Sequence, residues 1–276
     1  MIGETLALGG RSLTKWLRNP FSVIAASIQG LFWLALIGNS FNPANAFGSS
    51  TGSSLGVLQQ AFQGAPNYIT FLTPGVIGIV SLVGMSFMGV DQVFDRINGY
   101  IDVLRTYPIP RTSIYFGGVV QNVAKGMVTA IITFVLALLV PNGLKLAPDF
   151  GVASLMGVFA TIVLLVAVFS MLFTGIALSV KSTDSFFGAV NLLTFPIMFT
   201  SSGFFPLSFF PAWLKPIAQA NPITLASDAT RLLIVNGTLS ASQAQAFVGD
   251  WAGLAVYGAM FAAVGILMTR SALKAR

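Results

Sequence analysis

One uninterrupted charge-free stretch restricts what this chain can fold into. No Asp, Glu, Lys or Arg occurs between Arg18 and Asp91, and only 8% of all 276 residues are charged. A soluble domain has about 25% charged residues, far more than this chain carries. Together with the hydrophobic share of 55%, the low charge is typical of an integral membrane protein.

Apolar segments long enough to cross a bilayer recur six times along the chain. A hydrocarbon core of about 30 Å needs roughly 20 helical residues. The charge-free stretch contains two of these segments, because the polar run Gly48–Ser54 interrupts it. The predicted spans are 20–40, 68–90, 112–140, 151–180, 185–204 and 248–269. They predict an all-α polytopic membrane protein with six transmembrane helices, in which residues 1–276 form a single transmembrane domain.

The segment before the first span, residues 1–19, combines leucines with Arg11, Lys15 and Trp16. Such a mixture predicts an N-terminal amphipathic helix that lies at the membrane interface, with the indole at the level of the lipid headgroups. The alternative is an ordinary basic flank to the first span.

The stretch between the fifth and sixth spans, residues 203–236, is apolar but cannot form one spanning helix. It contains prolines at positions 206, 211, 216 and 222, and a proline inside a helix removes a backbone hydrogen bond. Non-helical backbone at membrane depth must be surrounded by protein. We therefore expect short helices at the outer leaflet, arranged as a re-entrant helical hairpin.

The distribution of Lys and Arg predicts the orientation. Ten of these residues fall on one side of the predicted spans and three on the other, while Lys125 lies inside the third span. Because basic loops stay in the cytoplasm, the side with ten is cytoplasmic. This puts both termini in the cytoplasm and makes the chain a multi-pass protein of the cell (inner or plasma) membrane.

The most charged segment, Asp91–Ser113, joins the second and third spans. It must lie in water, because a charge inside the hydrocarbon is costly. Within it, Tyr100–Arg105 follows Gly99 and carries both apolar and charged side chains. This pattern predicts a short helix at the membrane surface that a soluble partner could bind. A plain solvated connector between two spans is the alternative.

The residue types that most site chemistry requires are missing. The chain has no Cys and no His, so it lacks thiolate and imidazole as ligands, nucleophiles and bases. It contains no GxxxxGK[ST] phosphate loop and cannot hold ATP in that way. We expect no catalytic residue, no metal and no cofactor in this chain. We also expect no nucleic-acid partner, because the basic residues are scattered over the ends of the spans.

Several segments together resemble ABC-2 type permeases, and among these they resemble most the daunorubicin-resistance and multidrug export type. The resemblance rests on the loop Asp95–Arg111 and on the outer segments Ser202–Leu207, Pro211–Leu214, Asn221–Thr224 and Asp228–Arg231. It covers about the whole chain, with six spans in the same order. The chain departs from the family at Ile97–Asn98, where relatives often carry further acids, and in its long uncharged first external loop.

The resemblance implies a transport subunit without an ATPase site of its own. A separate ABC ATPase subunit would bind ATP and Mg, and the permease would work as a homodimer or heterodimer in contact with membrane lipid. A coupling helix would dock into the ATPase subunit. The residues of that helix here are Tyr100, Ile101, Asp102, Val103, Leu104 and Arg105. The residues of an outer hairpin or gate are Phe204, Phe205, Pro206, Trp213, Asn221, Pro222, Asp228 and Arg231.

The leading hypothesis is ATP-driven export of a hydrophobic or amphipathic compound, either drug-like or a lipid. Export of a polysaccharide or glycolipid by the same kind of permease is the nearest alternative. An ATP-independent secondary transporter or channel is weakened by the spans' lack of charge, since Lys125 is the one candidate for an ion relay or other buried function. A membrane scaffold without transport activity is also open.

Overall fold

The computed structural model describes residues 10, 14, 16, 18, 24, 28–38, 62–104, 106, 110–140 and 143–274. Most of the predicted interfacial helix, residues 1–19, and of the first external loop lies outside these residues. Within the described ranges the chain is helical and contains no strand, which confirms the all-α prediction.

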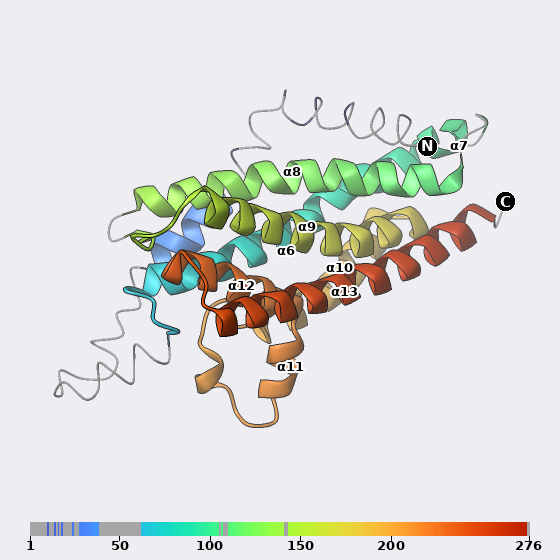
Figure 1. The fold of residues 1–276 in the computed structure, drawn as a ribbon. Coiled ribbons are helices and arrows are strands. Elements are labelled where there is room, and N and C mark those ends of the chain that lie inside the picture. The colour runs from blue at the N-terminus through green and yellow to red at the C-terminus, as the bar shows by residue number, and fades with distance from the viewer. Residues whose placement is uncertain are drawn as a thin grey trace.

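Four long helices form the body of the molecule (Figure 1). They are α6 (Tyr68–Ile97), α8 (Arg111–Leu139), α9 (Val152–Ser179) and α13 (Ala241–Lys274). Each is long and apolar enough to cross a membrane. They match the second, third, fourth and sixth predicted spans.

The sixth predicted span begins earlier than expected. Helix α13 already starts at Ala241, seven residues before the predicted boundary at position 248. Ser240 and Gln243 form a reciprocal cap there: the Ser240 backbone N donates to Gln243 Oε1 over 2.9 Å, and the Gln243 backbone N donates to Ser240 Oγ over 3.4 Å. This reciprocal cap starts α13 within a polar segment whose composition by itself predicts a loop.

The fifth predicted span is shorter than expected. Helix α10 covers Thr183–Phe199, so its 17 residues end before the predicted boundary at Phe204. The backbone N and the Oγ1 of Thr200 both donate to the Pro196 carbonyl, which closes the last turn. Of the first predicted span, 20–40, the described part contains an apolar helix over Ile28–Ile37 that includes the π-helical turn η1 (Trp33–Ile37). The count of six spans therefore stays a prediction.

Helix α6 lies at the centre of the bundle and α13 at its edge. The most apolar window of α6 is 83% buried inside the protein, against 17% for α13. The outer part of α6 approaches other backbone closely: a Cβ on Gly75 would collide with the backbone of Gly203. On α13, Gly265 packs directly on Gly175 of α9. Such close approaches of backbone are what small residues permit at contacts between membrane helices.

The proline-rich stretch folds into three short helices, as its sequence predicts. They are η2 (Leu207–Phe209), α11 (Lys215–Ala220) and α12 (Pro222–Asn236). The α11 segment projects from the bundle, whereas α12 packs against α6, α9 and α13 (Figure 1). The Asn221 side chain caps α12 by accepting from the Ile223 backbone N over 2.9 Å. Whether the hairpin is re-entrant stays a prediction.

The loops gather at the two ends of the bundle in the order that the predicted topology requires. At one end Asn67 Nδ2 donates to the Gly143 carbonyl over 2.9 Å, and Tyr68 Oη donates to the Phe204 carbonyl over 2.8 Å. At the other end lies the short helix α7 (Tyr100–Leu104). The first is named the outer end, after the side of the membrane predicted for it, and the second the α7 end.

Candidate functional site

The helix predicted at Tyr100–Arg105 is present as α7, joined to α6 by a sharp turn. Gly99 makes this turn with a backbone φ of 76°, a left-handed conformation that favours glycine. No atom lies within 4 Å of where its Cβ would be, so the backbone conformation rather than crowding accounts for the glycine. The first bond of α7 runs from the Val103 backbone N to the Gly99 carbonyl over 3.1 Å.

The two faces of α7 differ in burial. Ile101 is buried in a small apolar cluster with Ile114, Tyr115 and Leu178. On the opposite face Asp102 and Val103 are exposed, and the Val103 side chain has 54% of its surface accessible. Ile101 therefore seats α7 on the bundle, while Val103 is available to a partner.

This arrangement changes which residues of α7 can contact a partner. Of the apolar residues predicted for the coupling helix, Leu104 packs against the Ile101 cluster and Tyr100 is partly buried, so only Val103 is exposed. Arg105 lies outside the described residues. Which face of a short helix is buried depends on its neighbours, and helical spacing in the sequence does not reveal them.

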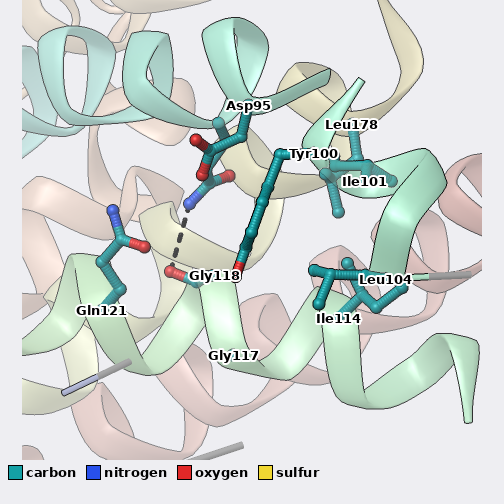
Figure 2. A pocket seen from close by; sticks show the side chains of 10 residues that line it. Asp95, Tyr100, Ile101, Leu104, Ile114, Gly117, Gly118, Gln121 and Leu178 are labelled. Atoms are coloured by element: carbon teal, nitrogen blue, oxygen red, sulfur yellow. Dashed lines mark hydrogen bonds between the residues drawn. The ribbon is translucent and has the colours of Figure 1, made fainter. Parts of the chain in front are cut away.

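A pocket lies between α7 and the ends of α6, α8 and α9 (Figure 2). The Tyr100 side chain extends from α7 across it toward α8. Gln92 Nε2 donates to the Gly118 carbonyl over 3.2 Å and so ties α6 to α8 at its floor. The lining residues are Gln92, Asp95, Tyr100, Ile101, Leu104, Ile114, Gly117, Gly118, Gln121 and Leu178. The pocket leaves space between α7 and the ends of the three long helices.

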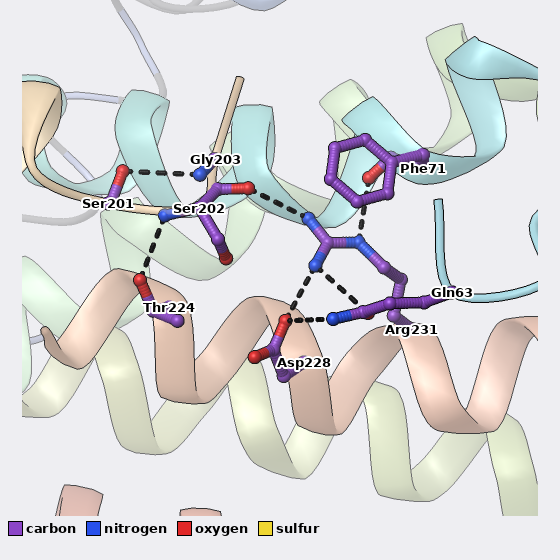
Figure 3. A network of polar contacts seen from close by, with 8 residues as sticks. All are labelled: Gln63, Phe71, Ser201, Ser202, Gly203, Thr224, Asp228 and Arg231. Atoms are coloured by element: carbon purple, nitrogen blue, oxygen red, sulfur yellow. Dashed lines mark hydrogen bonds and ion pairs between the residues drawn. The ribbon is translucent and has the colours of Figure 1, made fainter. Parts of the chain in front are cut away.

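At the outer end, Arg231 of α12 is the centre of a polar network (Figure 3). Its side chain is only 1% exposed. Its Nε donates to the Phe71 carbonyl over 2.9 Å, and its Nη2 donates to the Ser202 carbonyl over 3.1 Å. Its Nη1 donates to Asp228 Oδ1 over 2.6 Å. One guanidinium thus joins α12 to α6 and to the loop after α10.

Two further contacts complete this outer network. Gln63 accepts from Arg231 Nη1 through Oε1 over 3.3 Å and donates to Asp228 Oδ1 through Nε2, also over 3.3 Å. The guanidinium carbon lies 3.9 Å from the centroid of the Phe71 ring, a cation–π distance. Burial lowers the pKa of Arg231 to about 10, opposed by the Asp228 carboxylate, so the guanidinium stays charged at neutral pH. Burial also raises the pKa of Asp228, opposed by Arg231.

The other predicted gate residues are divided between the network's surroundings and the protein surface. Phe204 and Pro206 are buried, and the Phe204 ring lies 5.0 Å from that of Trp33. Asn221 and Pro222 are buried at the start of α12. Phe205 and Trp213 are instead exposed. The structure therefore does not bring the eight residues into one site.

Asp228 and Arg231 are both among the residues predicted for the outer hairpin, whereas three of their partners are not. Gln63, Phe71 and Ser202 contribute to the network, Phe71 and Ser202 through backbone carbonyls. A backbone acceptor leaves no signal in the residue type. Lys125, the charge predicted inside the third span, is fully buried and pairs with Asp91 of α6.

Known proteins similar to this chain are transport permeases. Residues 3–235 match the family model described as ABC-2 type transporter. Transport permease ycf38 of Porphyra purpurea is 30% identical over 240 residues, which cover 86% of this chain and 75% of that protein. The doxorubicin resistance ABC transporter permease protein DrrC of Mycobacterium tuberculosis is 25% identical over 274 residues, covering 96% and 88%. The daunorubicin resistance ABC transporter permease protein DrrB1 of Streptomyces coeruleorubidus is 24% identical over 235 residues, covering 84% and 75%.

Proposed function

The chain belongs to the ABC-2 type transporter family, and we propose that it is the transmembrane permease subunit of an ATP-driven exporter. A separate ABC ATPase subunit binds ATP and Mg and supplies the energy. The cargo is a hydrophobic or amphipathic compound, drug-like or lipid, moved out of the cell. Drug resistance in the names of two relatives supports this cargo class.

The observation that carries the proposal is the two-sided packing of α7. Ile101 attaches the helix to α8 and α9, while Val103 and Asp102 face away from the protein. Ile97, at the adjoining end of α6, is exposed as well. The exposed faces of Ile97, Asp102 and Val103, here called the docking surface, offer two apolar contacts beside a charge. A few buried anchors of this kind dominate the energy of protein interfaces.

The position of α7 explains how a docked ATPase would act on the spans. The helix lies between α6 and α8 in the chain, and its Ile101 packs on Ile114 and Tyr115 of α8 and on Leu178 of α9. A displacement of α7 would therefore be transmitted to three long helices at once. The chain itself has no phosphate loop, so hydrolysis must take place in the partner.

A second permease copy is also part of the proposal. One face of α10 exposes Leu192, Phe195 and Phe199, and the last two rings stack with centroids 6.4 Å apart. Packing of a second copy near this face, which belongs to the fifth predicted span, would leave the transport path between the copies. A homodimer and a heterodimer both satisfy this arrangement.

The orientation follows from the charge distribution. We assign the α7 end and both termini to the cytoplasm, and the outer end with the re-entrant hairpin to the opposite face of the cell membrane. The assignment assumes six spans, with α10 and the segment around Ile28–Ile37 as the two that the bundle of four lacks. Ten basic residues on the cytoplasmic side against three outside support it.

The test is a single charge on the docking surface. Val103→Asp puts an unpaired carboxylate into an apolar contact and should weaken binding of the ATPase subunit by about 2 kcal/mol or more. The fold should survive, because Val103 is exposed. Co-purification of the two subunits and ATP-dependent transport in reconstituted vesicles are the measurements.

The matched control is Leu146→Asp, the same kind of change on an exposed residue at the outer end. It should leave the ATPase subunit bound. Ile101→Asp should instead detach α7 from the bundle and lower the thermal stability. Retained ATPase binding and transport in Val103→Asp would show that α7 is a connector. Transport by vesicles that contain no ATPase subunit would favour an ATP-independent transporter.

A further inference from the structure

Helix α6 changes character near its α7 end. From Tyr68 to Ser86 nearly every side chain is buried, with Val83 the partial exception. Beyond Ser86 one face of α6 is exposed, where Phe87 is 64% exposed and Phe94 is 50% exposed. Residues four and seven positions apart lie on one helix face, so Asp91 falls between these two rings. Phe87, Asp91 and Phe94 are here called the α6 stripe.

An ion pair with a buried lysine of α8 holds the Asp91 carboxylate in place. Lys125 of α8 is fully buried, and its Nζ lies 2.7 Å from Asp91 Oδ2. The Asp91 side chain nevertheless remains 48% exposed. The ion pair therefore fixes the carboxylate in position while leaving part of it accessible on the surface of α6. Lys125 cannot serve as the accessible charge, because α8 and its neighbours enclose it.

The depth of the stripe matches the inner surface of the bilayer. Gly78 of α6 packs against Leu165, which lies at the middle of α9. Asp91 is 13 residues further along α6, about 20 Å along the helix axis. Half of the hydrocarbon core is about 15 Å thick, so with the middle of α9 taken as the bilayer midplane the carboxylate falls near the headgroups of the leaflet on the α7 side.

An accessible carboxylate between two exposed aromatic rings matches a particular ligand chemistry. A protonated amine is attracted both by a carboxylate and by the faces of aromatic rings. The apolar part of an amphipathic amine would lie toward the leaflet, beside the exposed Phe87 ring. An anion is disfavoured there, because Asp91 rather than Lys125 is exposed.

We propose that the α6 stripe binds amphipathic primary amines from the cytoplasmic leaflet and is the cargo-recognition site of the exporter. The proposal rests on the function proposed above and narrows its cargo class. Asp91 binds the ammonium, Phe87 and Phe94 contact its flanks, and Lys125 is a positioning residue that holds the carboxylate. Two copies of the permease would present two such stripes to the path between them.

The test measures binding without any ATPase subunit. The full chain is placed in nanodiscs of phosphatidylcholine, whose zwitterionic surface does not concentrate amines. The probes are monodansylcadaverine, an amphipathic primary amine, and its N-acetyl derivative, which carries no charge. Fluorescence anisotropy should show the amine binding at least about tenfold more tightly than the acetylated form, since a hydrogen bond to a charged group contributes about that factor.

Variants assign this preference to Asp91. Asp91→Asn should reduce amine binding to the level of the acetylated probe, and Asp91→Glu should retain most of it. If Asp91→Asn fails to fold because Lys125 is left without its counter-ion, Asp91→Asn/Lys125→Met removes both charges and keeps the test. Asp149→Asn is the matched control, an exposed acid at the outer end that should leave amine binding unchanged.

Three results would overturn the proposal. They are equal binding of the two probes, unchanged amine binding in both neutral variants, and loss of the permease dimer rather than of amine binding in Asp91→Asn. The last result would assign the stripe to contact between two copies. None of these outcomes bears on the docking of an ATPase subunit at α7, so failure of this proposal and failure of the proposed function are distinguishable.

Discussion

Replacing Arg231 with alanine should destabilise the outer end of the bundle more than any exposed substitution there. The change removes the donors to the Phe71 and Ser202 carbonyls and leaves Asp228 without its cationic partner. Removing one member of a buried ion pair costs about 3–5 kcal/mol. The hydrogen bonds and the cation–π contact involve the same group, so their energies are part of this loss and do not add to it.

Thermal unfolding of the purified chain in detergent measures the effect. For a chain of this size about 2–4 °C of melting temperature correspond to 1 kcal/mol, so Arg231→Ala should lower the melting temperature by about 6–20 °C. Arg231→Lys should lower the melting temperature by an intermediate amount, because an ammonium cannot reproduce the planar fork that reaches four separate acceptors. Lys215→Ala on α11, whose side chain is partly exposed, is the control. Equal, small shifts for Arg231→Ala and Lys215→Ala would refute the view that the network joins α12 to α6.

Two other predictions test the topology and the packing. The chain has no cysteine, so a single introduced cysteine reports its own position. Ser208→Cys should react with an impermeant maleimide on intact cells, and Thr106→Cys only after permeabilisation. Labelling of Thr106→Cys in sealed cells would show that the predicted orientation is wrong. Gly75→Val should prevent stable folding, because its side chain would meet the Gly203 backbone, which cannot move aside like a flexible side chain. Gly84→Ala, whose nearest neighbour would lie at 3.8 Å, should retain a normal melting temperature and expression, and similar losses in both variants would contradict this account.

Composition and spacing in the sequence were sufficient for the class of the fold. The charge-free run between Arg18 and Asp91 is not compatible with a water-soluble domain. Apolar segments of bilayer-spanning length must be helical, because only a helix satisfies its own backbone hydrogen bonds within the lipid. The prolines between positions 206 and 222 exclude a continuous span for a local steric reason. The short helix after Gly99 was predictable for the same kind of reason, because glycine ends one helix and two prolines follow the next.

Contacts between distant segments were decided only by the tertiary structure. The partners of Arg231 include two backbone carbonyls, and every residue type has a backbone carbonyl. The burial of Ile101 rather than Leu104 depends on how α8 and α9 approach α7, and the end of α10 depends on a turn around Pro196. Lys125 meets Asp91 across 34 positions of sequence, because α6 and α8 lie side by side in space. Sequence determines which segments must leave water, whereas packing determines which side chains then meet.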